Sequence, residues 1–258
     1  MDIAVVGAGA MGGLFSAFLH EAGHDVVLVD RNPDKARAIM AQGLFIEGVS
    51  GDRTLRLRVS ADPEQVGVRS LVLMCVKSYD TAAACRTTRP LVAPHTTVVT
   101  VQNGLGNVEA IGAAFGADRV LGGTTAHGAT VLNWGYLRHA GKGETVLGCP
   151  GSRGGDRLSR TVELFRAAGI DTRSTDDLEG LIWSKLVINV GINALTALLR
   201  VKNGILAENE SARAVLRGAV AEATEVVRAK GIRLLFDDAI TKVESVARAT
   251  AANRSSML

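Results

Sequence analysis

The stretch Ile3–Gly12, which reads IAVVGAGAMG, decides the fold. Four apolar residues of strand length run directly into a G-x-G-x-x-G pattern, and a helix-like run of small and apolar residues follows. In such a unit Gly7 permits the tight turn, Gly9 lets the backbone approach a pyrophosphate, and Gly12 lets helix and strand pack closely. We therefore expect the start of a sheet that binds a dinucleotide at its first helix.

A second predicted strand, Val26–Val29, ends at Asp30, at the spacing typical of the ribose-binding position. The Asp30 carboxylate favours NAD because it can accept from a ribose 2′-hydroxyl, whereas Arg31 favours NADP because it can pair with a 2′-phosphate. A glycine turn without a ligand is the alternative. The candidate cofactor-binding residues of this part of the chain are Gly7, Gly9, Ala10, Met11, Gly12, Asp30 and Arg31.

The rest of the N-terminal half alternates strands and helices, which predicts a parallel sheet with helices on both faces. The further strands expected are Leu71–Val76, Thr97–Val101 and Val120–Thr125, with an exposed hairpin within Leu44–Ser60 and a meander of Tyr136–His139 and Glu144–Leu147. After residue 174 only helices are predicted, the first being Leu178–Arg200. We expect an α/β fold: a Rossmann-like doubly wound domain over residues 1–174, then an all-helical domain over residues 175–258.

The composition excludes several classes of protein. Of 258 residues 47% are hydrophobic, which is too many for a disordered chain. The net charge is only +3 and the basic residues are scattered, so no nucleic acid partner is expected.

The N-terminus does not resemble a signal peptide. The longest apolar stretch, Leu186–Leu199, contains two asparagines, which indicates a buried helix rather than a membrane span. An odd count of three cysteines without a C-x-x-C pair favours a cytoplasmic protein. No residue cluster has metal-ligand spacing, so no metal is expected.

A polar row crosses the predicted helix 178–200. Lys185, Asn189 and Asn193 follow one another at i, i+4 and i+8, which places them on one face among apolar neighbours. An ammonium can stabilise and protonate the oxyanion that forms when hydride reaches a ketone, and two amides can hold hydroxyl or carboxylate groups. The alternative is a core helix whose lysine reaches solvent.

Polar residues also follow two of the predicted strands. Lys77 comes after Leu71–Val76 and Asn103 after Thr97–Val101, at strand ends where open parallel sheets bind ligands, although either can be an ordinary loop residue. His127 is the rival proton donor, and a structural histidine is the alternative reading of that position.

Motifs in order along the whole chain resemble the ketopantoate reductase (2-dehydropantoate 2-reductase) family. They are the glycine loop, Cys75–Ser78 (CVKS), Gln102–Gly106 (QNGLG), Trp183–Asn189 (WSKLVIN) with Asn193–Thr196 (NALT), and Asn253–Leu258 (NRSSML). The resemblance implies an oxidoreductase that reduces ketopantoate to pantoate with NADPH, in pantothenate and coenzyme A biosynthesis. The family pattern continues past Leu258 with an acidic substrate residue, so the helical domain is expected to be truncated.

The resemblance also assigns roles. Lys185 would be the catalytic general acid, and the substrate would be held by Asn103, Asn189, Asn193, Asn203, Asn253 and Ser256. Lys77 and Asn103 would join the cofactor-binding residues, with Asn103 near the nicotinamide. The expected cofactor is NADP, with NAD left open by Asp30, and the expected partner is a small 2-oxo acid. Exposed helix faces leave room for a homodimer. The alternatives are a reductase of another 2-oxo acid and a nicotinamide-binding protein without turnover.

Overall fold

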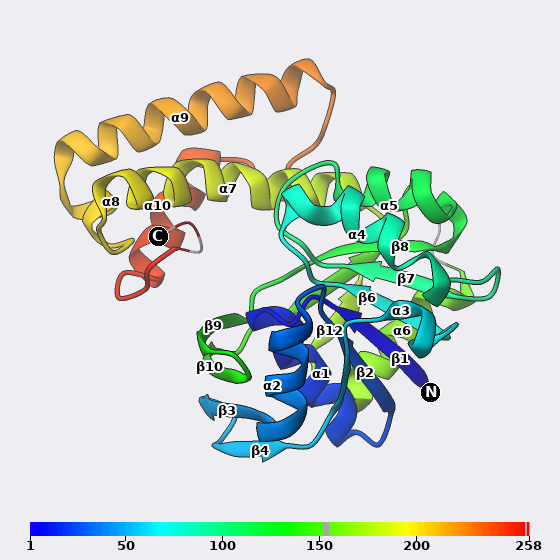
Figure 1. The fold of residues 1–258 in the computed structure, drawn as a ribbon. Coiled ribbons are helices and arrows are strands. Elements are labelled where there is room, and N and C mark those ends of the chain that lie inside the picture. Colours follow the sequence, from blue (N-terminus) through cyan, green and yellow to red (C-terminus); the bar gives the residue numbers. More distant parts are fainter. Residues whose placement is uncertain (152–154, 256, 258) are drawn as a thin grey trace. The chain divides into compact units, whose positions relative to one another are not determined.

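The computed structural model describes residues 1–151, 155–255 and 257. The chain divides into two compact units, Met1–Leu178 and Glu179–Leu258, and each is described by itself. The first is an α/β unit and the second is helical, which confirms the predicted fold class. Figure 1 shows the strands in the blue-to-green part of the chain and the helices of the second unit in yellow to red.

An eight-stranded sheet forms the centre of unit 1, in the order β12-β11-β8-β7-β6-β1-β2-β5. Its strands are β1 (Asp2–Val6), β2 (Asp25–Val29), β5 (Arg58–Ser60), β6 (Leu71–Met74), β7 (Thr97–Thr100), β8 (Val120–Thr125), β11 (Thr145–Gly148) and β12 (Thr172–Ser174). The six strands from β5 to β8 are parallel, whereas β11 runs antiparallel to β8. All parallel strands therefore end at one edge of the sheet.

Both faces of this sheet are buried, as the continuous apolar runs predict. In β1, Ile3 and Val5 belong to one core cluster, whereas Ala4 and Val6 belong to the other. The helices of unit 1 are α1 (Ala10–Glu21), α2 (Pro33–Gln42), α3 (Pro63–Val66), α4 (Thr81–Thr87), α5 (Asn107–Phe115) and α6 (Asp156–Ala167), with single 3-10 turns at Ser78–Asp80, Arg89–Leu91 and Ala117–Arg119. Residues of α1, α2 and α6 join the first core, and residues of α4 and α5 join the second.

A second sheet packs against α1. It has the order β4-β3-β10-β9, from β3 (Leu44–Gly48), β4 (Arg53–Leu55), β9 (Gly128–Asn133) and β10 (Tyr136–Gly141). The contact with α1 is close, since a Cβ on Gly13 would lie 2.3 Å from Leu137 Cδ1. Strands β3 and β4 form the predicted hairpin, but Leu44 and Ile46 are fully buried rather than exposed.

Two strand assignments made from the sequence are wrong. The end of the supposed hairpin, Arg58–Ser60, is β5 and pairs with β2 in the main sheet. The supposed meander is split, because β10 pairs with β3 and β9 while β11 pairs with β8 in the other sheet. Residues 128–133, for which no strand is predicted, form β9. Alternation of polar and apolar residues marks a strand but does not specify its partner, which is decided by tertiary contacts.

Unit 2 is built on α7 (Leu178–Leu199), α8 (Ile205–Glu208), α9 (Glu210–Ala229) and α10 (Ala239–Ala249). Its core joins Val187 and Ile192 of α7 to Val220 of α9 and Val243 of α10. Gly191 makes the close approach of these helices possible, since a Cβ there would lie 2.6 Å from Val243 Cγ1 and 2.8 Å from Val220 Cγ2. Helix α7 begins where the predicted helix 178–200 begins and ends one residue earlier.

Helix α7 is the one helix of the described chain that is long and apolar enough, by length and composition alone, to cross a membrane. Its mean hydropathy is 1.5 over the most apolar window. Val187 is fully buried and Ile192 nearly so, both against helices of the same unit. The prediction of a buried core helix is therefore confirmed.

Candidate cofactor and catalytic residues

The glycine loop has the shape that its sequence requires. Gly7 ends β1 with φ +105°, and a Cβ there would meet the Cys75 backbone at 3.0 Å. A Cβ on Gly12 would lie 1.9 Å from the Gly7 carbonyl oxygen, so helix α1 and strand β1 can meet only at glycine. Gly9, the N-cap of α1, differs because nothing lies within 4 Å of its Cβ position. The loop therefore leaves open space on the side where a pyrophosphate would approach the helix N-terminus.

Asp30 ties the end of β2 to this loop. Its Oδ2 accepts from the backbone N–H of Ala8 at 2.9 Å and from Lys35 Nζ at 2.9 Å, and its Oδ1 accepts from the Asn32 N–H at 3.1 Å. Burial alone would raise the pKa of Asp30, but these hydrogen bonds outweigh it and hold that pKa below its usual range. The carboxylate is therefore ionised, and a lysine lies beside it.

Arg31 is exposed beside Asp30 and pairs with Asp80, at 2.8 Å between Nη1 and Oδ1. The Arg31 side chain is 75% exposed, so it remains accessible to a ligand. Neither Lys35 nor Asp80 is among the residues predicted from the sequence. The signal for Lys35 is local, because it lies in the first turn of a helix that Asn32 caps directly after Asp30.

Lys77 and Asn103 follow the neighbouring parallel strands β6 and β7, and both are exposed. The two loops are joined, since Ser78 Oγ donates to the Asn103 carbonyl at 2.6 Å and Asn107 Nδ2 donates to the same oxygen at 3.1 Å. Unit 1 thus brings the glycine loop, Asp30, Lys77 and Asn103 to the carboxyl ends of adjacent parallel strands, where α/β sheets bind their ligands. These residues fit a dinucleotide.

In unit 2, Lys185, Asn189 and Asn193 lie along α7 and are all partly buried. Burial lowers the pKa of Lys185 to about 8, since removing an ammonium from water disfavours its charged form. Such an amine gives up a proton near neutral pH more readily than an ordinary lysine does.

The end of the described chain packs against the middle of unit 2. Asn203 donates from its backbone N–H to the Asn253 carbonyl at 3.0 Å and from Nδ2 to Thr250 Oγ1 at 2.9 Å. Ser255 Oγ accepts from Thr196 Oγ1 at 2.7 Å and donates to the Asn193 carbonyl at 3.4 Å. The Asn203 side chain is buried and that of Asn253 is exposed, whereas Ser256 lies outside the described residues.

His127 is in unit 1 and is not isolated. Its ring contacts the rings of Phe18 and His139, and its Nδ1 lies 3.1 Å from His139 Nε2. His139 is not among the candidates predicted from the sequence, because the two histidines are twelve positions apart and nothing in the segment between them indicates that they meet.

Comparison with known proteins covers both units. Residues 3–152 match the model of the family described as ketopantoate reductase PanE/ApbA, and residues 177–258 match that of its C-terminal domain. The chain belongs to the ketopantoate reductase family. Its members are NAD(P)-dependent oxidoreductases of 2-oxo acids, which confirms the predicted enzyme class at this level.

Individual relatives of this ketopantoate reductase family member extend the match. The 2-dehydropantoate 2-reductase of Halobacterium salinarum is 36% identical, over 100% of this chain and 84% of the relative. That of Archaeoglobus fulgidus is 34% identical, over 99% and 83%. The crystal structure of 2-dehydropantoate 2-reductase from Geobacter metallireducens has a TM-score of 0.93 at 33% identity, over 100% of this chain and 85% of that one. A D-mandelate dehydrogenase with NADH and anilino(oxo)acetate shares the fold, with a TM-score of 0.90 at 22% identity, over 100% and 84%.

Proposed function

We propose that this chain is a 2-dehydropantoate 2-reductase that reduces ketopantoate to pantoate with NADPH, a step of pantothenate and coenzyme A biosynthesis. The observation that carries the proposal is the partly buried Lys185 on α7, whose pKa of about 8 suits a proton donor. Named 2-dehydropantoate 2-reductases at 34–36% identity over almost the whole chain support the choice of substrate.

In the proposed mechanism the nicotinamide, when bound, supplies a hydride to C2 of the 2-oxo acid. Lys185 stabilises the negative charge that develops on the C2 oxygen and donates its Nζ proton to that oxygen. The amides of Asn189 and Asn193, one and two turns further along α7, hold the polar groups of the substrate. Asn103, Asn203, Asn253 and Ser256 remain predicted substrate residues, and the hydrogen bonds of Asn203 add a positioning role for the segment that carries Asn253.

On the cofactor side, Gly7, Gly9, Ala10, Met11 and Gly12 would receive the pyrophosphate at the N-terminus of α1. Lys77 and Asn103 would line the nicotinamide half. NADP is favoured by two cations at the end of β2: the exposed guanidinium of Arg31, and Lys35, which offsets the charge of Asp30. NAD is the alternative, because Asp30 keeps an ionised carboxylate at the ribose position.

We also propose that unit 1 is the cofactor domain and the helical unit the catalytic domain, that the enzyme is cytoplasmic, and that two copies can form a dimer. The cytoplasmic location is supported by Cys75, Cys85 and Cys149, which are all free thiols.

The test is an assay of a panel of 2-oxo acids with NADPH and with NADH. The expected result is the highest kcat/KM for ketopantoate with NADPH. A higher kcat/KM for another 2-oxo acid would assign the chain to the alternative reductase. Cofactor binding without oxidation of either cofactor on any acid would indicate a nicotinamide-binding protein without turnover.

A further inference from the structure

A pocket of about 520 Å³ lies inside unit 1, away from the glycine loop. Phe18 and Glu21 of α1 contribute to its wall, so it lies along the second half of a helix whose first turn carries the loop. Phe18 follows Gly9 by nine residues, which is about 14 Å along the helix axis at 1.5 Å per residue and separates the pocket from the dinucleotide position. The other lining residues are Val49, Ser50, Arg53, His127, His139, Lys142, Ala168 and Gly169.

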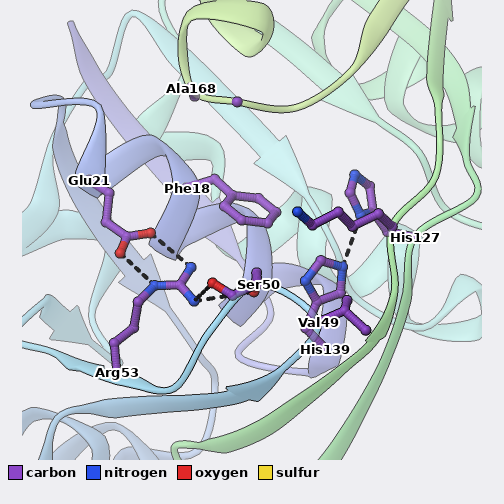
Figure 2. A pocket seen from close by; sticks show the side chains of 10 residues that line it. Phe18, Glu21, Val49, Ser50, Arg53, His127, His139 and Ala168 are labelled. Carbon is purple, nitrogen blue, oxygen red and sulfur yellow. Dashed lines mark hydrogen bonds and ion pairs between the residues drawn. The ribbon is translucent and has the colours of Figure 1, made fainter.

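The charged side chains that line this pocket do not cancel one another. Arg53 is neutralised, since its Nε and Nη2 donate to the two carboxylate oxygens of Glu21 at 2.5 and 2.9 Å, and its Nη1 donates to Ser50 (Figure 2). Lys142 has no ion-pair partner among the residues that the structure describes. The lining therefore carries one uncompensated positive charge, which favours an anionic ligand.

The protonation of the two histidines decides which kind of anion the pocket can bind. His139 Nε2 lies 3.0 Å from the Gly141 carbonyl, and a carbonyl oxygen can only accept, so this nitrogen carries the ring proton of neutral His139. His139 Nε2 also lies 3.1 Å from His127 Nδ1 and points the same N–H toward it. His127 Nδ1 is therefore a hydrogen-bond acceptor. His139 Nδ1 is then a bare acceptor in a ring that is 1% exposed, with no partner among the described residues. In Figure 2 the ring lies between His127 and the side of the pocket formed by Ser50 and Arg53.

We propose that this pocket binds a phosphate group that carries a proton and donates a hydrogen bond through that proton to His139 Nδ1, while Lys142 offsets the negative charge. A buried acceptor without a donor costs free energy, and a fully deprotonated anion such as sulfate cannot supply one. Hydrogenphosphate supplies both the proton and the negative oxygens. His127 acts as a positioning residue, because its Nδ1 helps to keep the proton of His139 on Nε2.

Burial, aided by neighbouring cations, keeps both histidines neutral near pH 7. Burial lowers the pKa of His127, aided by His139 and Lys142 and opposed by Asp171. Burial also lowers the pKa of His139, aided by Lys142 and Arg53 and opposed by the hydrogen bond to Gly141. Selection of phosphate over sulfate is therefore expected at neutral pH. It weakens in acid, where a protonated His139 can donate to either anion.

Calorimetric titration of the full chain with inorganic phosphate and with sodium sulfate tests this proposal. At pH 7.5 phosphate is expected to bind at least about tenfold more tightly than sulfate, because sulfate leaves the buried acceptor His139 Nδ1 without a donor. The difference should narrow toward pH 5. Phenyl phosphate in a third titration shows whether a monoester uses the apolar wall of Phe18 and Val49. Equal affinity for phosphate and sulfate at pH 7.5 overturns the proposal.

Variants locate the site. Lys142→Ala, at an exposed position, is expected to weaken phosphate binding about tenfold, whereas Lys242→Ala, an exposed lysine of α10, leaves it unchanged. Gly9→Ala is also expected to leave it unchanged, which separates the pocket from the glycine loop. Histidine-ring ¹⁵N spectra of the unmodified chain should show a phosphate-dependent shift at His139 Nδ1. Retained affinity in Lys142→Ala, or no change at that nitrogen, contradicts the assignment.

Discussion

Lys35 Nζ lies 2.9 Å from Oδ2 of Asp30, and both side chains are largely buried, at 18% and 12% exposure. An acidic residue at the end of the second strand ordinarily favours NAD, since it accepts from the ribose 2′-hydroxyl and repels a 2′-phosphate. Here the carboxylate already has a cation beside it. The pair makes the ribose position less negative than the sequence Asp30-Arg31 indicates.

Lys35→Met is therefore expected to shift cofactor preference toward NADH. Without the ammonium, the Asp30 carboxylate repels the 2′-phosphate. KM for NADPH should therefore rise about five- to tenfold, which corresponds to a loss of about 1 kcal/mol of binding free energy. Steady-state kinetics with both cofactors measure the change, and Lys242→Met is the matched control. An equal rise of KM for NADPH and NADH would mean that Lys35 only supports the loop.

Arg31→Ala should raise KM for NADPH about tenfold or more and KM for NADH much less, because the guanidinium is the exposed group that can pair with a 2′-phosphate. Asp80→Asn removes its partner and is expected to lower KM for NADPH slightly. The Tm should change little in both variants, since exposed ion pairs contribute about 0–1 kcal/mol. Unchanged NADPH kinetics in Arg31→Ala would contradict NADP as the cofactor.

Two glycines of the loop should respond differently to alanine. Gly12→Ala places a Cβ 1.9 Å from the Gly7 carbonyl oxygen, so strand and helix must separate and Tm should fall steeply. Gly9→Ala meets nothing within 4 Å, so Tm should stay the same while cofactor affinity falls, because the methyl group occupies the approach of the pyrophosphate. Thermal melts and fluorescence titration with NADPH check both. Wild-type cofactor affinity in Gly9→Ala would contradict the proposed binding mode.

Lys185→Met is expected to lower kcat about 10²–10⁴-fold while the fold persists, as loss of a general acid does. The wild-type kcat for ketone reduction should fall as pH rises through about 8, because only the protonated amine can donate. A pH–rate profile measures this. His127→Gln serves as the comparison for the rival donor, and loss of the alkaline limb in that variant instead of in Lys185→Met would reassign the general acid.

Lys185 should also affect the stability of the fold. The protonated amine that catalysis needs is the form that burial disfavours. Its pKa is about 8 in the folded chain against 10.5 ordinarily, so the unfolded chain binds more protons between these values. Wild-type stability should therefore rise with pH from about 8 to 10.5, and Lys185→Met should lack this rise and have an equal or higher Tm at pH 7. A lower Tm for the variant at pH 7 would mean that the amine stabilises the fold.

The local sequence of this protein determined the elements that depend on near neighbours. The run from Ile3 to Gly12 specified a strand, a turn and a helix, because an apolar run followed directly by a G-x-G-x-x-G pattern is typical of this unit. Helix α7 and its row of Lys185, Asn189 and Asn193 followed from the helical period, since residues four apart share a face. The candidate catalytic amine was therefore predictable from the sequence.

The partners of those elements were decided only by the tertiary structure. β5 and β11 belong to the main sheet, whereas β10 belongs to the second one. Arg31 pairs with Asp80, which lies 49 positions further along the chain, and His127 contacts His139, which lies twelve positions further. These contacts set the charge and the proton positions of the sites. They form between separate elements when packing removes water, so no local pattern of residues encodes them.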